Sequence, residues 1–149
     1  MKTYKEVEIL LVEDNPGDVR LTREALNVGR LLYHMDVVTD GVEALAYLRH
    51  EVPYTGSPLP DLILLDLNLP RMDGRELLGI IKSEPTIKCI PVVVLTTSKA
   101  EEDIIKSYNL HANCFITKPV DLDQFMAVIR SIEEFWFTIV RLPDKEKRE

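Results

Sequence analysis

The stretch Leu62-Ile63-Leu64-Leu65-Asp66 constrains this chain more than any other, because four apolar residues run directly into one carboxylate. An apolar run this short, bounded by Pro58, Pro60 and Pro70, is typical of a strand buried on both faces. Asp66 would then stand at the carboxyl end of the strand, where open α/β sheets bind their ligands. A lone Asp at a strand exit can equally be the N-cap of the next helix.

The rest of the chain alternates between short apolar runs and helical patterns. Strands are predicted at Val7–Val12, Met35–Thr39, Leu62–Asp66, Ile90–Leu95 and Ala112–Thr117. Helices are predicted at Pro16–Val28, Val42–Leu48, Arg75–Lys82 and Glu101–Tyr108, with a last one running from Asp121 through Trp136 towards Val140. This alternation predicts a single α/β domain over residues 1–149, with a doubly wound five-stranded parallel sheet of order 2-1-3-4-5 and helices on both faces.

Composition restricts the classes of partner and compartment. The formal net charge of -7 argues against nucleic acid held by a broad basic face. The longest apolar runs are strand-sized, which predicts no membrane span, and no signal peptide is recognisable. Cys89 and Cys114 are isolated in the sequence. We therefore expect a cytoplasmic protein in which both cysteines are free and largely buried.

Polar side chains follow four of the five predicted strands. In chain order, these side chains are Glu13, Asp14, Asp66, Thr96, Thr97 and Lys118. Because the first and third strands are neighbours in the predicted sheet, three carboxylates and one ammonium would share a crevice. Like charges this close are costly unless a cation lies between them, and hard carboxylate oxygens suit Mg²⁺.

These residue types suggest a role for each member of the group. Asp14 would hold Mg²⁺ directly and Glu13 partly through water, while Asp66 would be a carboxylate nucleophile towards phosphorus. Lys118 would neutralise charge on the transferred phosphoryl group, and Thr96 would donate its hydroxyl to a phosphoryl oxygen. Each residue alone could be a cap or a solvated loop residue, but their joint placement favours an Mg²⁺ and phosphoryl site.

Four blocks of sequence resemble, in order and spacing, the signature of a response-regulator receiver domain. The blocks are LLVEDN at 10–15, LILLDLNLPRMDG at 62–74, VVVLTTS at 92–98 and FITKP at 115–119. The resemblance covers about residues 6–132. It implies a flavodoxin-like, CheY-like single domain that a sensor histidine kinase phosphorylates, and that signals through a phosphorylation-linked change in protein–protein association.

The resemblance also implies site residues. It makes Asp66 both the phosphoacceptor and a metal ligand, with Glu13 and Asp14 as the acidic metal-binding pair and with Thr96 and Lys118 completing the catalytic set.

Three further features are implied by the resemblance alone. The backbone carbonyl of Asn68 would ligate Mg²⁺, Phe115 would be the rotating aromatic switch that acts with Thr96, and the Lys118-Pro119 bond is expected to be cis.

Some positions depart from the commonest receiver pattern. Glu13 replaces the more usual Asp, and Thr97 stands where a small Ala is frequent, so that access to Asp66 could be narrower. The loop Arg49–Leu59 is longer than in compact receivers, and we expect it to touch a partner. Together with the carboxyl-terminal segment, this loop resembles single-domain regulators that are paired with cyanobacterial phytochromes, which implies a phytochrome as the kinase.

Two other functions are compatible with an acid-lined α/β domain, a phosphatase and a binding module. A Mg²⁺-dependent phosphatase of the haloacid-dehalogenase kind places its Asp nucleophile on the first strand, with a second Asp two residues later. Here Asn15 and Pro16 follow the acidic pair, and no cap domain is recognisable. A binding module that works without phosphate is disfavoured by the complete site. We therefore expect a signalling protein rather than an enzyme.

The segment 133–149 is unusually apolar for the end of such a domain. Its apolar interface candidates are Phe135, Trp136, Phe137, Ile139 and Val140. A contiguous patch of this kind usually marks an interface, and a symmetric dimer is the commonest way to cover it. The sequence therefore predicts a homodimer through this extension, and the alternative is that the segment folds back over its own domain.

Overall fold

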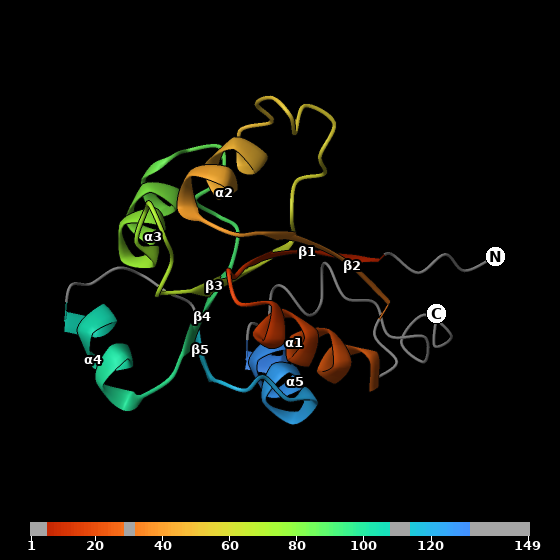
Figure 1. The fold of residues 1–149 in the computed structure, drawn as a ribbon, viewed down its shortest axis with the longest axis vertical. Helices are drawn as coiled ribbons and strands as arrows, with labels where there is room; N and C mark the ends of the chain where they lie inside the picture. Colours follow the sequence, from red (N-terminus) through yellow and green to blue (C-terminus); the bar gives the residue numbers. More distant parts are fainter. Residues whose placement is uncertain (1–5, 29–31, 108–113, 132–149) are drawn as a thin grey trace.

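Five short strands form one parallel sheet in a computed structural model that describes residues 6–28, 32–107 and 114–131 (Figure 1). The strands are β1 (Val7–Val12), β2 (Tyr33–Val38), β3 (Leu62–Asp66), β4 (Val92–Thr96) and β5 (Cys114–Thr117). Their order is β2-β1-β3-β4-β5, which confirms the predicted fold class and topology.

The five helices alternate with the strands along the chain. They are α1 (Pro16–Val28), α2 (Gly41–Leu48), α3 (Gly74–Ser83), α4 (Lys99–Ser107) and α5 (Leu122–Ser131). In Figure 1, α1 and α5 lie on one side of the sheet and α2 and α3 on the other. The helices therefore cover both faces, as a doubly wound sheet requires.

The apolar run before Asp66 is buried on both faces, as its sequence predicts. Ile63 and Leu65 pack into the core beneath α2 and α3, whereas Leu62 and Leu64 pack into the core on the other face. All four side chains are fully buried. Because the strand lies at the centre of the sheet, it presents Asp66 at the middle of the carboxyl edge.

Side-chain caps fix where several helices begin. The backbone N–H of Asp18 donates to Asn15 Oδ1 at 3.0 Å at the start of α1. Gln124 N–H donates to Asp121 Oδ1 at 2.8 Å at the start of α5. Both contacts satisfy N–H groups that have no partner within the helix. They orient α1 and α5 from the carboxyl ends of β1 and β5.

Some predicted boundaries and burial states were wrong. The strand β4 begins at Val92 rather than Ile90, since Pro91 has no N–H to donate, although its carbonyl accepts from Ile63 N–H at 3.0 Å. Cys89 is exposed, so its predicted burial is corrected, whereas Cys114 is partly buried against the core. Ile87 and Ile90 flank Cys89 and fill the core there instead.

The predicted extension at 133–149 lies outside the described residues, as do its candidate interface residues Phe135, Trp136, Phe137, Ile139 and Val140. Among the helices that the structure describes, none combines the length and apolar character needed to cross a bilayer.

Candidate phosphoryl and metal site

Three carboxylates meet at the carboxyl ends of β1 and β3. Val12 is paired with Leu65 in the parallel register, so the next residues, Glu13 and Asp66, leave the sheet side by side. Oxygens of Glu13, Asp14 and Asp66 all lie within 4.8 Å of one another. Glu13 and Asp66 are 1% and 4% exposed, whereas Asp14 is open to solvent. The structure therefore brings together the three acidic residues that the sequence analysis selected.

Lys118 follows β5 and reaches into this group. Its Nζ lies 2.8 Å from Glu13 Oε1 and 3.1 Å from Asp66 Oδ2. The same Nζ also lies 3.0 Å from Asp18 Oδ2, a contact that the sequence analysis did not predict. Asp18 could have been suspected, since the first turn of α1 begins at the carboxyl end of β1 and faces the same crevice.

The charge balance of the group is uneven. Burial, reinforced by the neighbouring Asp66, raises the pKa of Glu13 to about 7 even though Lys118 opposes the shift. Burial by itself would lower the pKa of Lys118, but its contacts with Glu13 and Asp18 and the charge of Asp66 raise it overall. One ammonium thus contacts three carboxylates, with Asp14 close to two of them, and a further cation would relieve the repulsion among these acids.

The donor set fits a hard divalent cation. All the candidate ligand atoms are carboxylate oxygens, which Mg²⁺ prefers, and the exposed Asp14 leaves room for the waters that this ion retains. Glu13 Oε1 is buried and forms an ion pair with Lys118, but it accepts no aligned hydrogen bond within the described part of the chain. A buried carboxylate oxygen without an aligned hydrogen bond can accept one from a water molecule bound to the metal.

The loop between β3 and α3 closes one side of the site. The N–H of Asn68 donates to Asp66 Oδ1 at 3.2 Å, and Gly74 N–H donates to the Leu67 carbonyl at 3.0 Å. A Cβ at Gly74 would lie 2.5 Å from the carbonyl oxygen of Asp66, so only glycine allows the start of α3 to approach β3 so closely. The predicted metal-ligating role of the Asn68 carbonyl stays a prediction.

Thr96 ends β4 beside Asp66. In the register of β3 and β4, Asp66 pairs with Leu95, which places Thr96 one residue further along the same edge. Thr96 is 1% exposed, and its hydroxyl has no hydrogen-bond partner among the residues that the structure describes. A buried hydroxyl usually has a partner, so this one is available to a group that enters the crevice.

The strand β5, which pairs with β4, carries the predicted aromatic switch Phe115 opposite Val94. Phe115 is half-buried and packs against the core beneath α2 and α3. The N–H of Lys118 donates to the Thr96 carbonyl at 2.8 Å, which ties the exits of β4 and β5 together. The Lys118-Pro119 bond is cis, as predicted.

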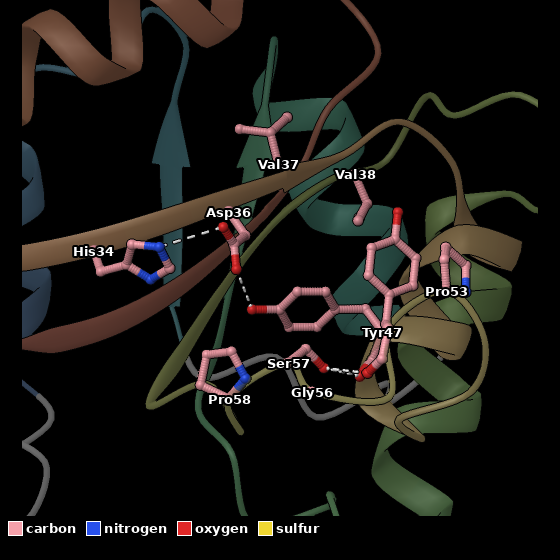
Figure 2. Close-up of a pocket in the computed structure, with 10 residues that line it drawn as sticks. His34, Asp36, Val37, Val38, Tyr47, Pro53, Gly56, Ser57 and Pro58 are labelled. Atoms are coloured by element: carbon pink, nitrogen blue, oxygen red, sulfur yellow. Dashed lines mark hydrogen bonds and ion pairs between the residues drawn. The ribbon is translucent and has the colours of Figure 1, made fainter.

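A second hollow, of about 460 Å³, lies away from the acidic group between β2 and the loop after α2 (Figure 2). Its polar side chains have partners: Tyr47 Oη donates to Asp36 Oδ2 at 2.6 Å, and His34 lies between Asp36 and Glu8. Tyr54, from the long loop, donates its hydroxyl to Glu43 of α2. This loop thus packs against its own domain at Tyr54, and its predicted contact with a partner stays a prediction.

Comparison with known proteins identifies the family to which this chain belongs. The response regulator receiver domain family matches residues 9–130. The response regulator Rcp1 of Synechocystis sp. is 49% identical over 135 residues, which cover 91% of this chain and 92% of that protein.

Solved structures agree with the sequence match. A phosphorylated cyanobacterial phytochrome response regulator, RcpA, is 54% identical with a TM-score of 0.73, covering 93% of this chain and 99% of that chain. The Mn²⁺-bound form of Rcp1 is 48% identical with a TM-score of 0.71, covering 92% and 99%. The chain therefore belongs to the response regulator receiver domain family and is a response regulator of two-component signalling.

Proposed function

We propose that Asp66 accepts a phosphoryl group from a histidine kinase, with Glu13, Asp14, Asp66 itself and the Asn68 carbonyl binding Mg²⁺. The observation that carries this proposal is the convergence of three carboxylates and one ammonium at one crevice. A carboxylate oxygen of Asp66 would attack phosphorus while the bond from phosphorus to the kinase imidazole breaks, and the imidazole keeps the electron pair. When bound, Mg²⁺ would neutralise charge on the phosphoryl oxygens.

Lys118 and Thr96 supply the remaining interactions of the proposed reaction. The Nζ of Lys118, 3.1 Å from Asp66 Oδ2, can turn from the carboxylate to a phosphoryl oxygen on the same residue. The hydroxyl of Thr96 can donate to another phosphoryl oxygen. Phe115 would then turn inwards as Thr96 moves, a shift between two pre-existing states of β4 and β5.

The kinase that we infer is a phytochrome. RcpA is described as a cyanobacterial phytochrome response regulator, and this chain is 54% identical to it. Autophosphorylated phytochrome kinase should transfer its label to this protein faster than an unrelated sensor kinase does. Equal transfer rates from both kinases would contradict the specific pairing without affecting the receiver assignment.

A signalling role is favoured over phosphatase activity, because Asn15 and Pro16 stand where a haloacid-dehalogenase phosphatase has its second Asp. Incubation with Mg²⁺ and acetyl phosphate, followed by intact mass, separates the two functions. The receiver predicts an adduct of one phosphoryl group per chain. Continuous hydrolysis of added phosphate esters would indicate the enzyme instead, and neither result would indicate a phosphate-independent binding module.

Self-association is the second part of the proposed function. We infer a homodimer from the apolar residues of segment 133–149, with Trp136 and Phe137 near its centre, and we infer a cytoplasmic location. Phosphorylation would adjust the strength of the dimer. Sedimentation should show a dimer for the full chain at micromolar concentration and a monomer after truncation at Glu133. A monomeric full chain, or a truncated chain that still dimerises, would contradict the proposal.

A further inference from the structure

The tip of the β3–α3 loop is held by an ion pair that the phosphoryl chemistry does not use. Arg71 has a φ of 64°, a backbone conformation that residues other than glycine rarely adopt. Its Nε and Nη2 both donate to Asp40 Oδ2, at 2.9 and 2.6 Å. The side chain thus links the loop that carries Asn68 to the start of α2, on another part of the sheet edge.

Asp40 divides its two carboxylate oxygens between two tasks. Oδ1 accepts from Glu43 N–H at 2.7 Å and caps α2, whereas Oδ2 accepts both donors of Arg71. Asp40 is only 7% exposed, and its cap contact fixes this end of the ion pair at the N-terminus of α2. Burial alone would raise the pKa of Asp40, but these hydrogen bonds lower it overall, which keeps the carboxylate charged.

Close packing leaves the loop tip little room to move. A Cβ at Gly41 would lie 2.7 Å from Cβ of Met72 and 2.9 Å from its carbonyl oxygen. The loop therefore rests against the first residue of α2, next to the ion pair. Met72 N–H donates to the Pro70 carbonyl at 2.7 Å, so the turn around Arg71 is also fixed within itself.

The start of the same loop is held by different contacts. Asn68 Nδ2 donates to Glu101 Oε2 at 3.0 Å, and Glu101 Oε1 accepts from Thr97 N–H at 2.9 Å. Asn68 is therefore fixed on the α4 side by Glu101, and the loop beyond it is fixed on the α2 side by Asp40. Between these two anchors stands the backbone carbonyl of Asn68.

We propose that Arg71 and Asp40 are positioning residues for the metal site, because their ion pair holds the β3–α3 loop where the Asn68 carbonyl can meet the cation. This inference rests on the proposed function, since it needs a metal at Glu13, Asp14 and Asp66. Neighbours that orient a ligand without touching the metal commonly change affinity by about 10- to 100-fold when they are removed.

The variant Asp40→Asn separates the ion pair from the helix cap. Asparagine is an equally good N-cap, so its oxygen can keep the contact with Glu43 N–H, while its NH₂ group cannot accept from Arg71. Mn²⁺ binding, followed through the electron paramagnetic resonance of the free ion and by Mg²⁺ competition, should weaken about tenfold. Glu24→Gln on α1, across the sheet, removes the same charge and should leave the affinity unchanged.

The variant Arg71→Gly tests the same contact from the other side. Glycine adopts a φ of 64° without steric cost, so this variant removes the steric strain of the backbone at position 71 as well as the ion pair. Its Mn²⁺ affinity should fall by about the same factor as that of Asp40→Asn. The double variant should bind no more weakly than either single variant, because both remove one interaction.

A different result is expected if the ion pair of Arg71 and Asp40 stabilises the fold without affecting the metal site. Thermal unfolding with EDTA would then change in both variants while Mn²⁺ affinity stayed at the wild-type value, and that result would overturn the proposal. Asp14→Ala distinguishes this failure from a failure of the proposed function. If Asp14→Ala loses Mn²⁺ and the two loop variants do not, only the positioning role is wrong. If Asp14→Ala also binds normally, the metal site and the positioning role fall together.

Discussion

Two groups of ionisable side chains lie along β1 and its neighbours, and they differ in how deeply their carboxylates are buried and in how completely their polar atoms are hydrogen-bonded. Towards the amino end of β1, Glu8 faces His34 at 2.8 Å and Asp36 accepts from Tyr47 at 2.6 Å, partly in solvent. At the carboxyl end, buried Glu13 and Asp66 share Lys118 with Asp18, and Asp14 lies close to both buried acids. The Thr96 hydroxyl there has no hydrogen-bond partner among the described residues.

The comparison separates a structural network from a chemical site. Both groups contain carboxylates at hydrogen-bond distance from a donor, so acidic composition alone does not distinguish them. The difference is that the carboxylates at the carboxyl end are buried and share a single ammonium, an arrangement that favours binding of a further cation and of a phosphoryl group. The acids of the network around His34 are less buried, and Glu8 and Asp36 lie within hydrogen-bond distance of separate partners, His34 and Tyr47.

The largest expected effect is on phosphorylation itself. Asp66→Asn should abolish uptake of phosphoryl from acetyl phosphate, because an amide has the same shape but is not a nucleophile. Asp36→Asn makes the matching change in the other group and should be phosphorylated like the wild type. Intact mass measures both. Uptake by Asp66→Asn at the normal rate would remove Asp66 from its proposed role.

The next effect is on metal affinity. Mg²⁺ should bind the unphosphorylated protein weakly, since few protein ligands hold it. Asp14→Ala should weaken this binding by more than about tenfold, whereas Glu8→Ala should not change it. Titration of backbone amide shifts with Mg²⁺ provides the measurement. Equal Mg²⁺ affinity in Asp14→Ala and the wild type would show that the acidic pair is only a cap and does not bind the metal.

A smaller effect is expected on the conformational response. Thr96→Ala should still accept a phosphoryl group, yet phosphorylation should change dimer or partner affinity about fivefold less than in the wild type. Thr96→Ser keeps the hydroxyl and should behave like the wild type. Affinities measured with and without phosphodonor test this pair. A normal response in Thr96→Ala would place the switch elsewhere.

The smallest expected effect is on the pH dependence of stability, through the contact between His34 and Glu8. The hydrogen bond to Glu8 is the main cause that raises the pKa of His34. This contact therefore stabilises the fold fully below the unfolded pKa of about 6.5, and the stabilisation is lost as pH rises through the folded value.

Urea unfolding of the wild type and His34→Gln at about pH 6 and about pH 8 measures this contribution. The advantage of the wild type should be larger at the lower pH, and it should stay below about 1 kcal/mol because the pair is partly exposed to solvent. Glu13 is present in both proteins, so its titration cancels in the difference. An advantage that grows with pH would contradict the assigned partners.

The sequence was sufficient for the parts of the site that follow from strand topology. The apolar run before Asp66 identifies the central strand, and parallel strands must end at one edge, so Glu13, Thr96 and Lys118 were placed correctly beside it. Neither inference needs the angle of a helix or the path of a loop.

Contacts that depend on helix rotation or loop path could not be predicted. The ion pair of Asp18 with Lys118 requires the orientation of α1, and the contact of Arg71 with Asp40 requires a left-handed residue at the loop tip. The burial of Cys89 was misjudged for a similar reason, since its neighbours Ile87 and Ile90 turn towards the core in its place.

The central claim is that Asp66 receives the phosphoryl group, rather than one of the acids beside it at the carboxyl end of the sheet. Borohydride reduces an acyl phosphate to an alcohol, so treatment after phosphorylation with Mg²⁺ and acetyl phosphate converts the modified aspartate to homoserine. Peptide mass spectrometry should find homoserine at position 66, in the tryptic peptide that ends at Arg71. Homoserine at Asp14 or Asp18 instead, or no reduced residue in a protein that carries phosphate, would contradict the account.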